Sequence, residues 1–594
     1  MKKLIALIVA GSCLGGLSAK EFYVSHLKDA NGNPYYEGAP EGATIYTDIQ
    51  TALNKCDNTD CTVWVEDGFV CDSGDQEASG HSRLNVGKNK TVLRSRSGDW
   101  RTGVTVIGKY ATDVDTGYGA DAIRCMVVNG GTCKIIGFKF ENGATRNNTS
   151  WAADSQNCGG GVYVYANAAP QISNCCFSAC RARYNGGGVC GKDASIYRDC
   201  FFENCKAGSN GSGFSSGKAY NCVFTNMSGT AMVLPSVISN CTVTASKTAV
   251  SITASGYDAL VEDCWFTNNA NHGIVIAGGR ASIYRTVIAN NTSDEQGAGI
   301  YVKGGSAYGE GLTITNNVAA NVGGGTYNMV LNRCSLIGNS SISTSWALGR
   351  AGGAYGGILS NCVVACNFAG KTADTFDAGN GGGGTYNAQC IGCVISNNVS
   401  GYRGGGMMFD DNNYDNYNNI VVGNDLKLVN NGGGSGAYRG RHYNSLFVGN
   451  KAAVGAALDC SLAVNCTVTG NTTESTIYRG GIDSAVCINT ISWGNTPAKD
   501  KLPSATNCCF KTLAEIGGGT GNITIDPKFR TVDGLPYYPG AAKCRNSGLG
   551  DFDWMTDPAD PRSKDVYGNA RIQGSAPDMG AAECVSLGLM LLFR

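Results

Sequence analysis

The chain has 594 residues, among them 85 glycines, 28 cysteines and only 12 prolines. Its 46 lysines and arginines nearly balance 47 aspartates and glutamates, which gives a net charge of −1. A chain without excess positive charge has no overall field that would attract a phosphate polymer, so we expect no nucleic-acid partner. Abundant glycine with little proline is typical of many turns around short strands.

The first 19 residues have the pattern of a secretion signal. Lys2 and Lys3 precede the apolar run Leu4–Ala10, and small residues follow as far as Ala19. We therefore expect residues 1–19 to be absent from the mature protein, and the protein to be exported to the extracellular space or the cell surface. Residues 10–13, Ala-Gly-Ser-Cys, leave a second interpretation open, in which Cys13 carries a lipid anchor.

Residues 20–90 are predicted to form an N-terminal cap and the first strands. Thr47-Asp48-Ile49-Gln50 has the pattern of a capping box, and the apolar residues that follow, up to Cys56, have helical spacing. Val63-Trp64-Val65 alternates as a strand should. A short capping helix at this point would cover the open end of a repeat array.

Residues 91–512 repeat one unit. Each copy has a small residue, often cysteine, then an apolar residue two places on and an asparagine soon after, as in Cys200, Phe202 and Asn204. The copies recur about every 24 residues, which is a solenoid period. Period-two alternation broken by glycine and asparagine indicates short strands and tight turns. We therefore predict an all-β fold, a parallel β-helix of roughly 15 or more rungs.

Within such a solenoid the inward positions stack in columns. Pairs such as Cys222/Phe224 and Cys466/Val468 are predicted to form neighbouring apolar ladders, with asparagines at the bends because asparagine tolerates left-handed backbone. Runs of glycine suit a corner where a side chain would clash or φ is positive; they occupy residues 159–161, 186–188, 323–325, 381–384, 404–406 and 432–434.

The 28 cysteines fit the same ladder, in which cysteine acts as a small apolar residue. Disulfides are expected among the cysteines outside the ladder, either within Cys56, Cys61 and Cys71 or between Cys180 and Cys205. A zinc site is not expected, because paired C-x-x-C motifs are lacking and the four histidines are scattered.

Three stretches resemble known families. The opening, FYVS…IQTAL…VWVEDG, looks like the start of secreted right-handed parallel β-helix proteins of the pectate-lyase-like superfamily. The F-x-x-N and G-G-G-[VT] elements of the body resemble repeats of polymorphic outer-membrane proteins. Residues 565–571, DVYGNAR, with 578–583, DMGAAE, look like the closing motif of the choice-of-anchor Q type domain of bacterial surface β-helices. The resemblance implies a right-handed β-helix, with residues 513–594 as its C-terminal cap.

The closing motif carries Asp565, Arg571, Asp578 and Glu583. Four such side chains look like a reaction centre, but in a terminal cap we interpret them as structural ion pairs and turn hydrogen bonds. The tail Cys584–Arg594 contains the apolar run LGLMLLF, which is too short to span a bilayer, so we expect no membrane-spanning segment in the mature chain. The tail is interpreted as a last strand over the end of the solenoid, or as the remnant of a sorting signal.

The most polar insertion, residues 407–419, is the candidate ligand site. Asp410, Asp411 and Asp415 offer oxygen ligands for a possible Ca²⁺, and Tyr414 and Tyr417 offer rings for stacking on sugars. Two further insertions, 339–357 and 367–384, precede it in rung order. If the three emerge on one side they would wall a groove along the solenoid.

Three functions follow from this interpretation. We favour a non-catalytic adhesin or rod that binds a polysaccharide or another cell-surface polymer. The alternative is a polysaccharide lyase or glycoside hydrolase with its site in residues 339–419, although the scattered fragments of polygalacturonase-like motifs do not assemble a catalytic set. The third is a structural component of the cell envelope. No catalytic residue is assigned.

Overall fold

The computed structural model describes residues 19–77, 81–112, 115–147, 156–343, 349–371, 381–427 and 433–584. Residues 1–18 of the expected secretion signal, which include Cys13, and residues 585–594 of the tail lie outside these residues, as do the middle parts of the insertions 339–357 and 367–384. The chain divides into two compact units, residues 1–201 and 202–594. Within the described ranges, no helix is both long and apolar enough to cross a bilayer.

The first unit stacks parallel strands from its start. In its first sheet β1 (Lys20–Val24) pairs with β3 (Cys61–Val65) and β2 (Ile45–Tyr46), and β3 pairs with β6 (Thr91–Ser95). The other strands of this sheet are β5 (Ser82–Val86), β8 (Arg124–Val128), β9 (Lys134–Ile136), β11 (Val162–Val164), β12 (Gln171–Ser173), β15 (Val189–Cys190) and β16 (Ile196–Arg198). The second sheet contains β4 (Val70–Cys71), β7 (Val104–Ile107), β10 (Phe138–Glu141) and β13 (Cys176–Ser178). The parallel stack thus begins at Lys20, within the stretch that the sequence assigned to the cap.

The short capping helix is present as α1 (Ile49–Leu53), one residue out of register with the expected capping box. Asp48, not Thr47, is the N-cap, and its carboxylate accepts a hydrogen bond from the Thr51 amide at 2.6 Å. Gln50 bonds across to the backbone of Asn85 on β5 instead of back to the cap. Cys56 lies beyond the helix and forms a disulfide with Cys61. Cys71, Cys180 and Cys205 are buried thiols.

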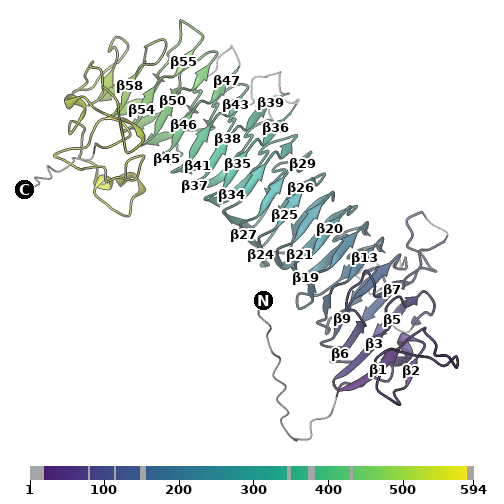
Figure 1. The fold of residues 1–594 in the computed structure, drawn as a ribbon. Coiled ribbons are helices and arrows are strands. Elements are labelled where there is room, and N and C mark those ends of the chain that lie inside the picture. Colours follow the sequence, from purple (N-terminus) through teal and green to yellow (C-terminus); the bar gives the residue numbers. More distant parts are fainter. Residues whose placement is uncertain are drawn as a thin grey trace, which may run out of the picture. The chain divides into compact units, whose positions relative to one another are not determined.

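The second unit repeats one rung whose strands belong to three parallel sheets (Figure 1). Most rungs give the first sheet either one long strand or two shorter ones. Its strands are β19 (Phe214–Tyr220), β21 (Thr230–Ser239), β23 (Thr248–Ile252), β24 (Asp258–Glu262), β26 (His272–Ile276), β27 (Arg280–Tyr284), β30 (Ile300–Val302), β31 (Ser306–Glu310), β34 (Thr326–Asn332), β37 (Ala354–Ser360), β40 (Thr385–Tyr386), β41 (Gln389–Ile391), β44 (Met407–Met408), β45 (Asp415–Tyr417), β48 (Ala437–Tyr438), β49 (Arg441–Tyr443), β52 (Leu458–Asp459), β53 (Leu462–Val464), β56 (Ile482–Asp483), β57 (Val486–Ile488) and β59 (Ser504–Thr506).

The second sheet of this unit has one short strand per rung, and the third has strands of two or three residues. The second sheet comprises β20 (Val223–Thr225), β22 (Thr242–Thr244), β25 (Trp265–Thr267), β28 (Val287–Ala289), β32 (Thr313–Thr315), β35 (Ser335–Ile337), β38 (Val363–Ala365), β42 (Val394–Ser396), β46 (Ile420–Val422), β50 (Leu446–Val448), β54 (Thr467–Thr469), β58 (Ile491–Trp493) and β60 (Cys509–Phe510). The third comprises β29 (Thr292–Ser293), β33 (Val318–Ala319), β36 (Ser340–Ile342), β39 (Phe368–Gly370), β43 (Val399–Ser400), β47 (Asp425–Leu426), β51 (Lys451–Ala452) and β55 (Thr472–Thr473).

The predicted inward ladders are confirmed. Phe224, Phe266 and Val468 are fully buried on the inner face of the second sheet, and Cys222 and Cys466 are buried at the preceding bend. Burial raises the pKa of the Cys466 thiol to about 12, so it stays a neutral, apolar side chain at physiological pH. The glycine corners behave as expected too: a Cβ on Gly325 would lie 2.5 Å from the carbonyl oxygen of Gly353 on the next rung.

Asparagine has two structural roles in the rungs, and the sequence predicted only the first of them. The first asparagine of an Asn-Asn pair takes the left-handed conformation at the bend, for example Asn316 with φ 53°. The second points inward and joins a buried ladder in which each side-chain amide donates to the next, as Asn317 Nδ2 does to Asn339 Oδ1 at 2.9 Å. The ladder runs through Asn269, Asn291, Asn317, Asn339, Asn367, Asn398, Asn424, Asn450, Asn471 and Asn495.

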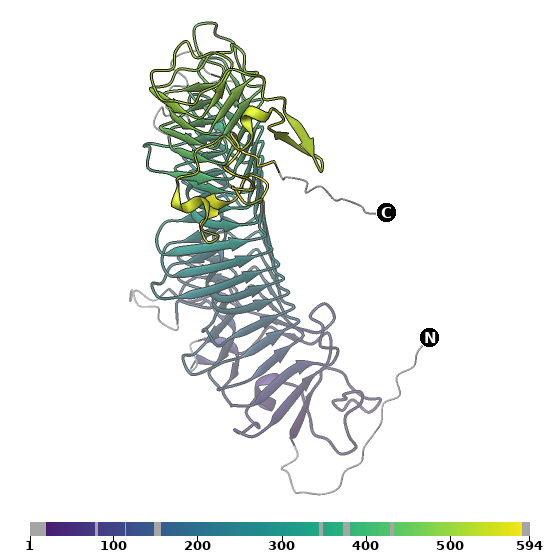
Figure 2. The ribbon, with the colours of Figure 1, turned by 90° about the vertical axis from the view of Figure 1, so that its left-hand side faces the viewer.

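The C-terminal segment, defined here as residues 544–584, lies along the side of the rungs (Figure 2). Before it comes the antiparallel pair β61 (Arg530–Val532) and β62 (Leu535–Tyr538), and it contains the short 3-10 turns η3 (Asp553–Met555) and η4 (Pro561–Ser563), with η2 (Ala542–Cys544) at its start. The bend asparagines Asn418, Asn444 and Asn489 donate side-chain hydrogen bonds to its backbone. Residues 513–594 were expected to form a C-terminal cap. Within that range, these three amides hold residues 544–584 against the side of the rungs.

Candidate functional site

The structure separates the five residues that the sequence grouped as a ligand site. Asp410 and Asp411 are exposed in the loop between β44 and β45. Tyr414, the last residue of that loop, is half-buried, as are Asp415 and Tyr417 in β45. They come from one segment, but each turns toward different neighbours.

The three carboxylates have separate partners. Asp410 accepts hydrogen bonds from the Tyr386 hydroxyl and from Asn387 Nδ2, the latter at 2.8 Å. Asp411 accepts a hydrogen bond from the Asn413 amide at 2.8 Å, within its own turn. Asp415 makes an ion pair of 2.5 Å with Arg441, its register partner on β49. A Ca²⁺ bound by all three would have to displace these contacts, so calcium binding here stays a prediction.

A groove of about 510 Å³ lies beside this segment. Its lining comes from successive rungs of the first sheet and includes Asn328, Tyr355, Asn387, Gln389, Tyr414 and Asp415. Asn328 and Asn413 are exposed, so amide donors and acceptors face the solvent at its edge. Two of the three insertions, 339–357 through Tyr355 and 407–419 through Tyr414, thus meet at one groove.

Tyr414 and Tyr417 have different surroundings. The Tyr414 ring stacks on Phe409 with centroids 5.0 Å apart and an interplanar angle of 30°, so one face is held and the side chain lines the groove. The Tyr417 hydroxyl accepts a hydrogen bond from Gln389 at 3.0 Å, and its ring packs against Tyr443. Tyr414 is therefore the better candidate for stacking on a ligand, while Tyr417 supports the groove from beside it.

A column of tyrosines on the outer face of the first sheet was not predicted. Tyr327, Tyr355 and Tyr386 occupy register positions of β34, β37 and β40, and consecutive rings are parallel within 5° at 5.1 and 5.2 Å. Because the rings stack on one another, each covers a face of its neighbour, and Tyr386 at the end of the column is fully buried. The sequence signal is the recurrence of Gly-Gly-Gly-Thr-Tyr-Asn at 323–328 and 382–387.

The same column continues into a pair of acids. Asp459 on β52 and Asp483 on β56 are register partners on neighbouring rungs. Burial, together with the charge of Asp483, raises the pKa of Asp459 to about 6, and Arg403 and Arg439 oppose that rise. A carboxyl group with a raised pKa beside a second carboxyl group is the arrangement from which acid–base pairs are built.

Titration of Asp459 should make the free energy of unfolding depend on pH. The folded chain holds a proton on this carboxyl from about pH 4 to about pH 6 while the unfolded chain has lost it, so the free energy of unfolding falls as pH rises through that window. Asp459→Asn, which cannot ionise, should flatten this fall in thermal unfolding curves recorded at a series of pH values. A variant that loses as much stability as the parent over the same window would contradict the assignment.

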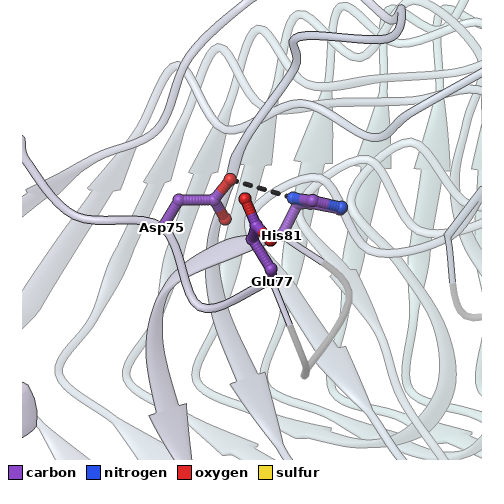
Figure 3. A group of neighbouring side chains, drawn as sticks. All are labelled: Asp75, Glu77 and His81. Atoms are coloured by element: carbon purple, nitrogen blue, oxygen red, sulfur yellow. Dashed lines mark hydrogen bonds and ion pairs between the residues drawn. The ribbon is translucent and has the colours of Figure 1, made fainter.

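A second cluster lies in the first unit, in the loop between β4 and β5 (Figure 3). His81 Nδ1 lies 2.9 Å from Asp75 Oδ2, and ligand atoms of Asp75, Glu77 and His81 all fall within 4.8 Å of one another. Among the described residues this is the group with the spacing of a metal site, and it includes one of the four histidines that looked scattered in sequence. The contact between His81 and Asp75 is sufficient to explain why these three side chains lie together in the loop.

The closing motif is structural, as the sequence interpretation held. Asp565 accepts backbone hydrogen bonds from Tyr567, Asn569 and Glu583 at 2.8 to 2.9 Å. Arg571 donates to the carbonyl oxygen of Gly580 and lies 3.6 Å from Glu583. Asp565, Arg571, Asp578 and Glu583 are at most 1% exposed, so a substrate has no access to them.

Stacked parallel sheets, inward apolar columns and the match to a family model define a right-handed parallel β-helix protein. Residues 122–292 match the model described as "right handed beta helix region". No curated protein matches the chain.

Solved structures of similar fold are distant. They include pectate lyase Pel9A, at 10% identity over 96% of this chain and 97% of that one with a TM-score of 0.19. The A-module of the Azotobacter vinelandii mannuronan C-5 epimerase AlgE6 has 10% identity over 81% and 95%, with a TM-score of 0.23. The tailspike of E. coli bacteriophage HK620 has 14% identity over 84% and 80%, with a TM-score of 0.17. Alignments at these scores carry no argument about the chemistry of this chain.

Proposed function

We propose that this protein is an exported β-helix that binds a polysaccharide in the groove beside residues 407–419, as an adhesin or polymer-binding rod without catalysis. The observation that carries the proposal is the groove itself, in which the Tyr414 ring, held by Phe409, faces a polar lining of Asn387, Gln389 and Asp415. A sugar presents apolar C–H faces to a ring and hydroxyls to amides and carboxylates, so this lining has both kinds of contact.

The test is retention of the purified chain on a panel of immobilised acidic and neutral polysaccharides, with and without Ca²⁺. Tyr414→Ala is expected to weaken binding about tenfold, equivalent to about 1.4 kcal/mol, because the stacking ring is lost. Tyr414→Phe keeps the ring and should bind nearly as the parent does. Tyr35→Ala, at a tyrosine 45% exposed in the first unit, is the matched surface control.

Unchanged binding by Tyr414→Ala would remove the groove from consideration. Loss of binding on calcium removal, reproduced by Asp411→Asn, would support the predicted Ca²⁺ site.

The alternative function is an enzyme, a polysaccharide lyase or glycoside hydrolase. The pairing of Asp459 with Asp483 favours it, because glycoside hydrolysis uses two carboxyl groups, and the pKa of Asp459 is raised to about 6 beside its register partner. The same panel of polysaccharides tests this alternative. A hydrolase would release reducing ends from the polymer, and a lyase would release unsaturated ends. Release abolished by Asp459→Asn would place catalysis on this pair, and release abolished at Asp410, Asp411 or Asp415 would place it in the insertion.

A further inference from the structure

We propose that Cys509 and Cys544 form a disulfide that fastens the C-terminal segment to the last rungs. Both side chains have no exposed surface, and they belong to one buried cluster with Ile491 and Met579. Cys509 Sγ donates to the Ile525 carbonyl oxygen at 3.1 Å. The interaction between the two sulfurs raises the pKa of the Cys509 thiol and lowers that of the Cys544 thiol. This proposal is independent of what the groove binds.

The two thiols approach from different elements. Cys509 lies on β60 as the register partner of Ile491, on the outer face that the C-terminal segment covers, whereas Cys544 ends η2. The ladder cysteines differ, since Cys241 and Cys264 project in parallel from neighbouring rungs about 4.8 Å apart. A disulfide needs Cβ atoms roughly 3.5–4.5 Å apart, so rung spacing disfavours a bridge within the ladder and does not constrain Cys509 and Cys544.

The chemistry is thiol–disulfide exchange with a small-molecule or protein disulfide as oxidant. The Cys544 thiolate attacks one sulfur of the oxidant and releases a thiol, and Cys509 then displaces the second thiol. The two cysteines lose two protons and two electrons in total, and the oxidant is reduced to two thiols. The interaction with Cys509 lowers the pKa of the Cys544 thiol, which favours Cys544 as the attacking thiolate.

The link would act where the segment is already anchored. The Met579 amide donates to the Cys544 carbonyl at 2.8 Å, and Asn489 Nδ2 donates to the Leu549 carbonyl at 2.9 Å. A covalent bond at Cys544 holds the start of the segment, so these contacts need not be re-formed from a free chain. Because both sulfurs are fully buried once the segment is in place, the exchange takes place while it docks, and the finished bond is shielded from reductants.

The experiment is refolding of the full chain in a buffer of reduced and oxidised glutathione, followed by alkylation, digestion and peptide mapping without reductant. A linked pair of peptides containing Cys509 and Cys544 is expected, lighter by two hydrogen atoms than the two thiol peptides. Cys241 and Cys264 should be alkylated. Because Cys508 shares a peptide with Cys509, Cys508→Ser should keep the link and Cys509→Ser should abolish it.

Limited proteolysis gives a second readout. Cys544→Ser should make the C-terminal segment several times more susceptible to cleavage under oxidising conditions and leave its susceptibility unchanged under reducing ones. Separate alkylation of both Cys509 and Cys544 in a sample whose Cys56–Cys61 bridge has formed would overturn the proposal. A link that survives Cys509→Ser would overturn it as well, since it would assign the bridge to Cys508.

Discussion

Replacement of Asn317 by alanine is expected to lower the free energy of unfolding by about 3 kcal/mol, because buried donors and acceptors lose their partners. Asn317 Oδ1 accepts from the Asn291 amide at 3.0 Å, and its Nδ2 donates to the Ile288 carbonyl at 2.9 Å. Asn317 is fully buried, so water cannot take over these bonds. The ladder would be interrupted between Asn291 and Asn339.

The measurement is denaturant unfolding, with hydrogen exchange to localise the loss, since a repeat array need not unfold in one step. Asn316→Gly is the matched control one residue earlier: Asn316 is exposed with φ 53°, a conformation that glycine adopts freely, and we expect a change within about 0.5 kcal/mol. Equal effects of the two substitutions would show that the inward ladder contributes no more than the bend.

Asp565→Ala should be more damaging, with an expected loss of about 3–5 kcal/mol from the C-terminal segment. Three backbone amides, those of Tyr567, Asn569 and Glu583, would lose their acceptor inside a region closed to water. The substitution would also remove the negative charge of Asp565 from the surroundings of Arg571. Glu583 is a weak replacement for that charge, because burial raises its pKa to about 8.

Unfolding curves and hydrogen exchange of β50 and β54 would detect the effect. The segment bonds to β54 through the Ala581 amide and Thr467 Oγ1 at 2.9 Å, and to the bend before β50 through Asn444 Nδ2 and the Lys564 carbonyl at 2.8 Å, so its release should expose both strands. Asp551→Ala, at an exposed acid in the same segment, is the control. If the amides of β54 stay protected from hydrogen exchange in Asp565→Ala, the segment remains in place without an intact closing motif.

Much of the fold could be predicted from spacing alone. The recurrence of Cys-x-Phe-x-Asn, as at 222–226, marks a bend, an inward residue and the next bend, and each of these depends on local backbone preference or on the two-residue period of a strand. The short helix was predicted for the same reason, although its N-cap is Asp48 and not Thr47.

The candidate site was predicted less completely. Residues 407–419 do border a groove, but Tyr355, Asn387 and Gln389 on other rungs supply much of its lining. The carboxylates that looked like a cluster turn to Tyr386, Asn413 and Arg441 because each sits on a different part of the loop. Spacing within one segment does not fix which side chains of the neighbouring rungs meet it.

The sequence by itself determined the period, the inward columns and the bends, since these depend on residues a few positions apart. Only the tertiary structure decided the asparagine ladder, the tyrosine column and the groove, because rungs separated by more than twenty residues must align in register before those side chains touch. It also placed the C-terminal segment along the side of the rungs. The amides of Asn418, Asn444 and Asn489 are distant in sequence from the segment, and only folding brings them beside its backbone.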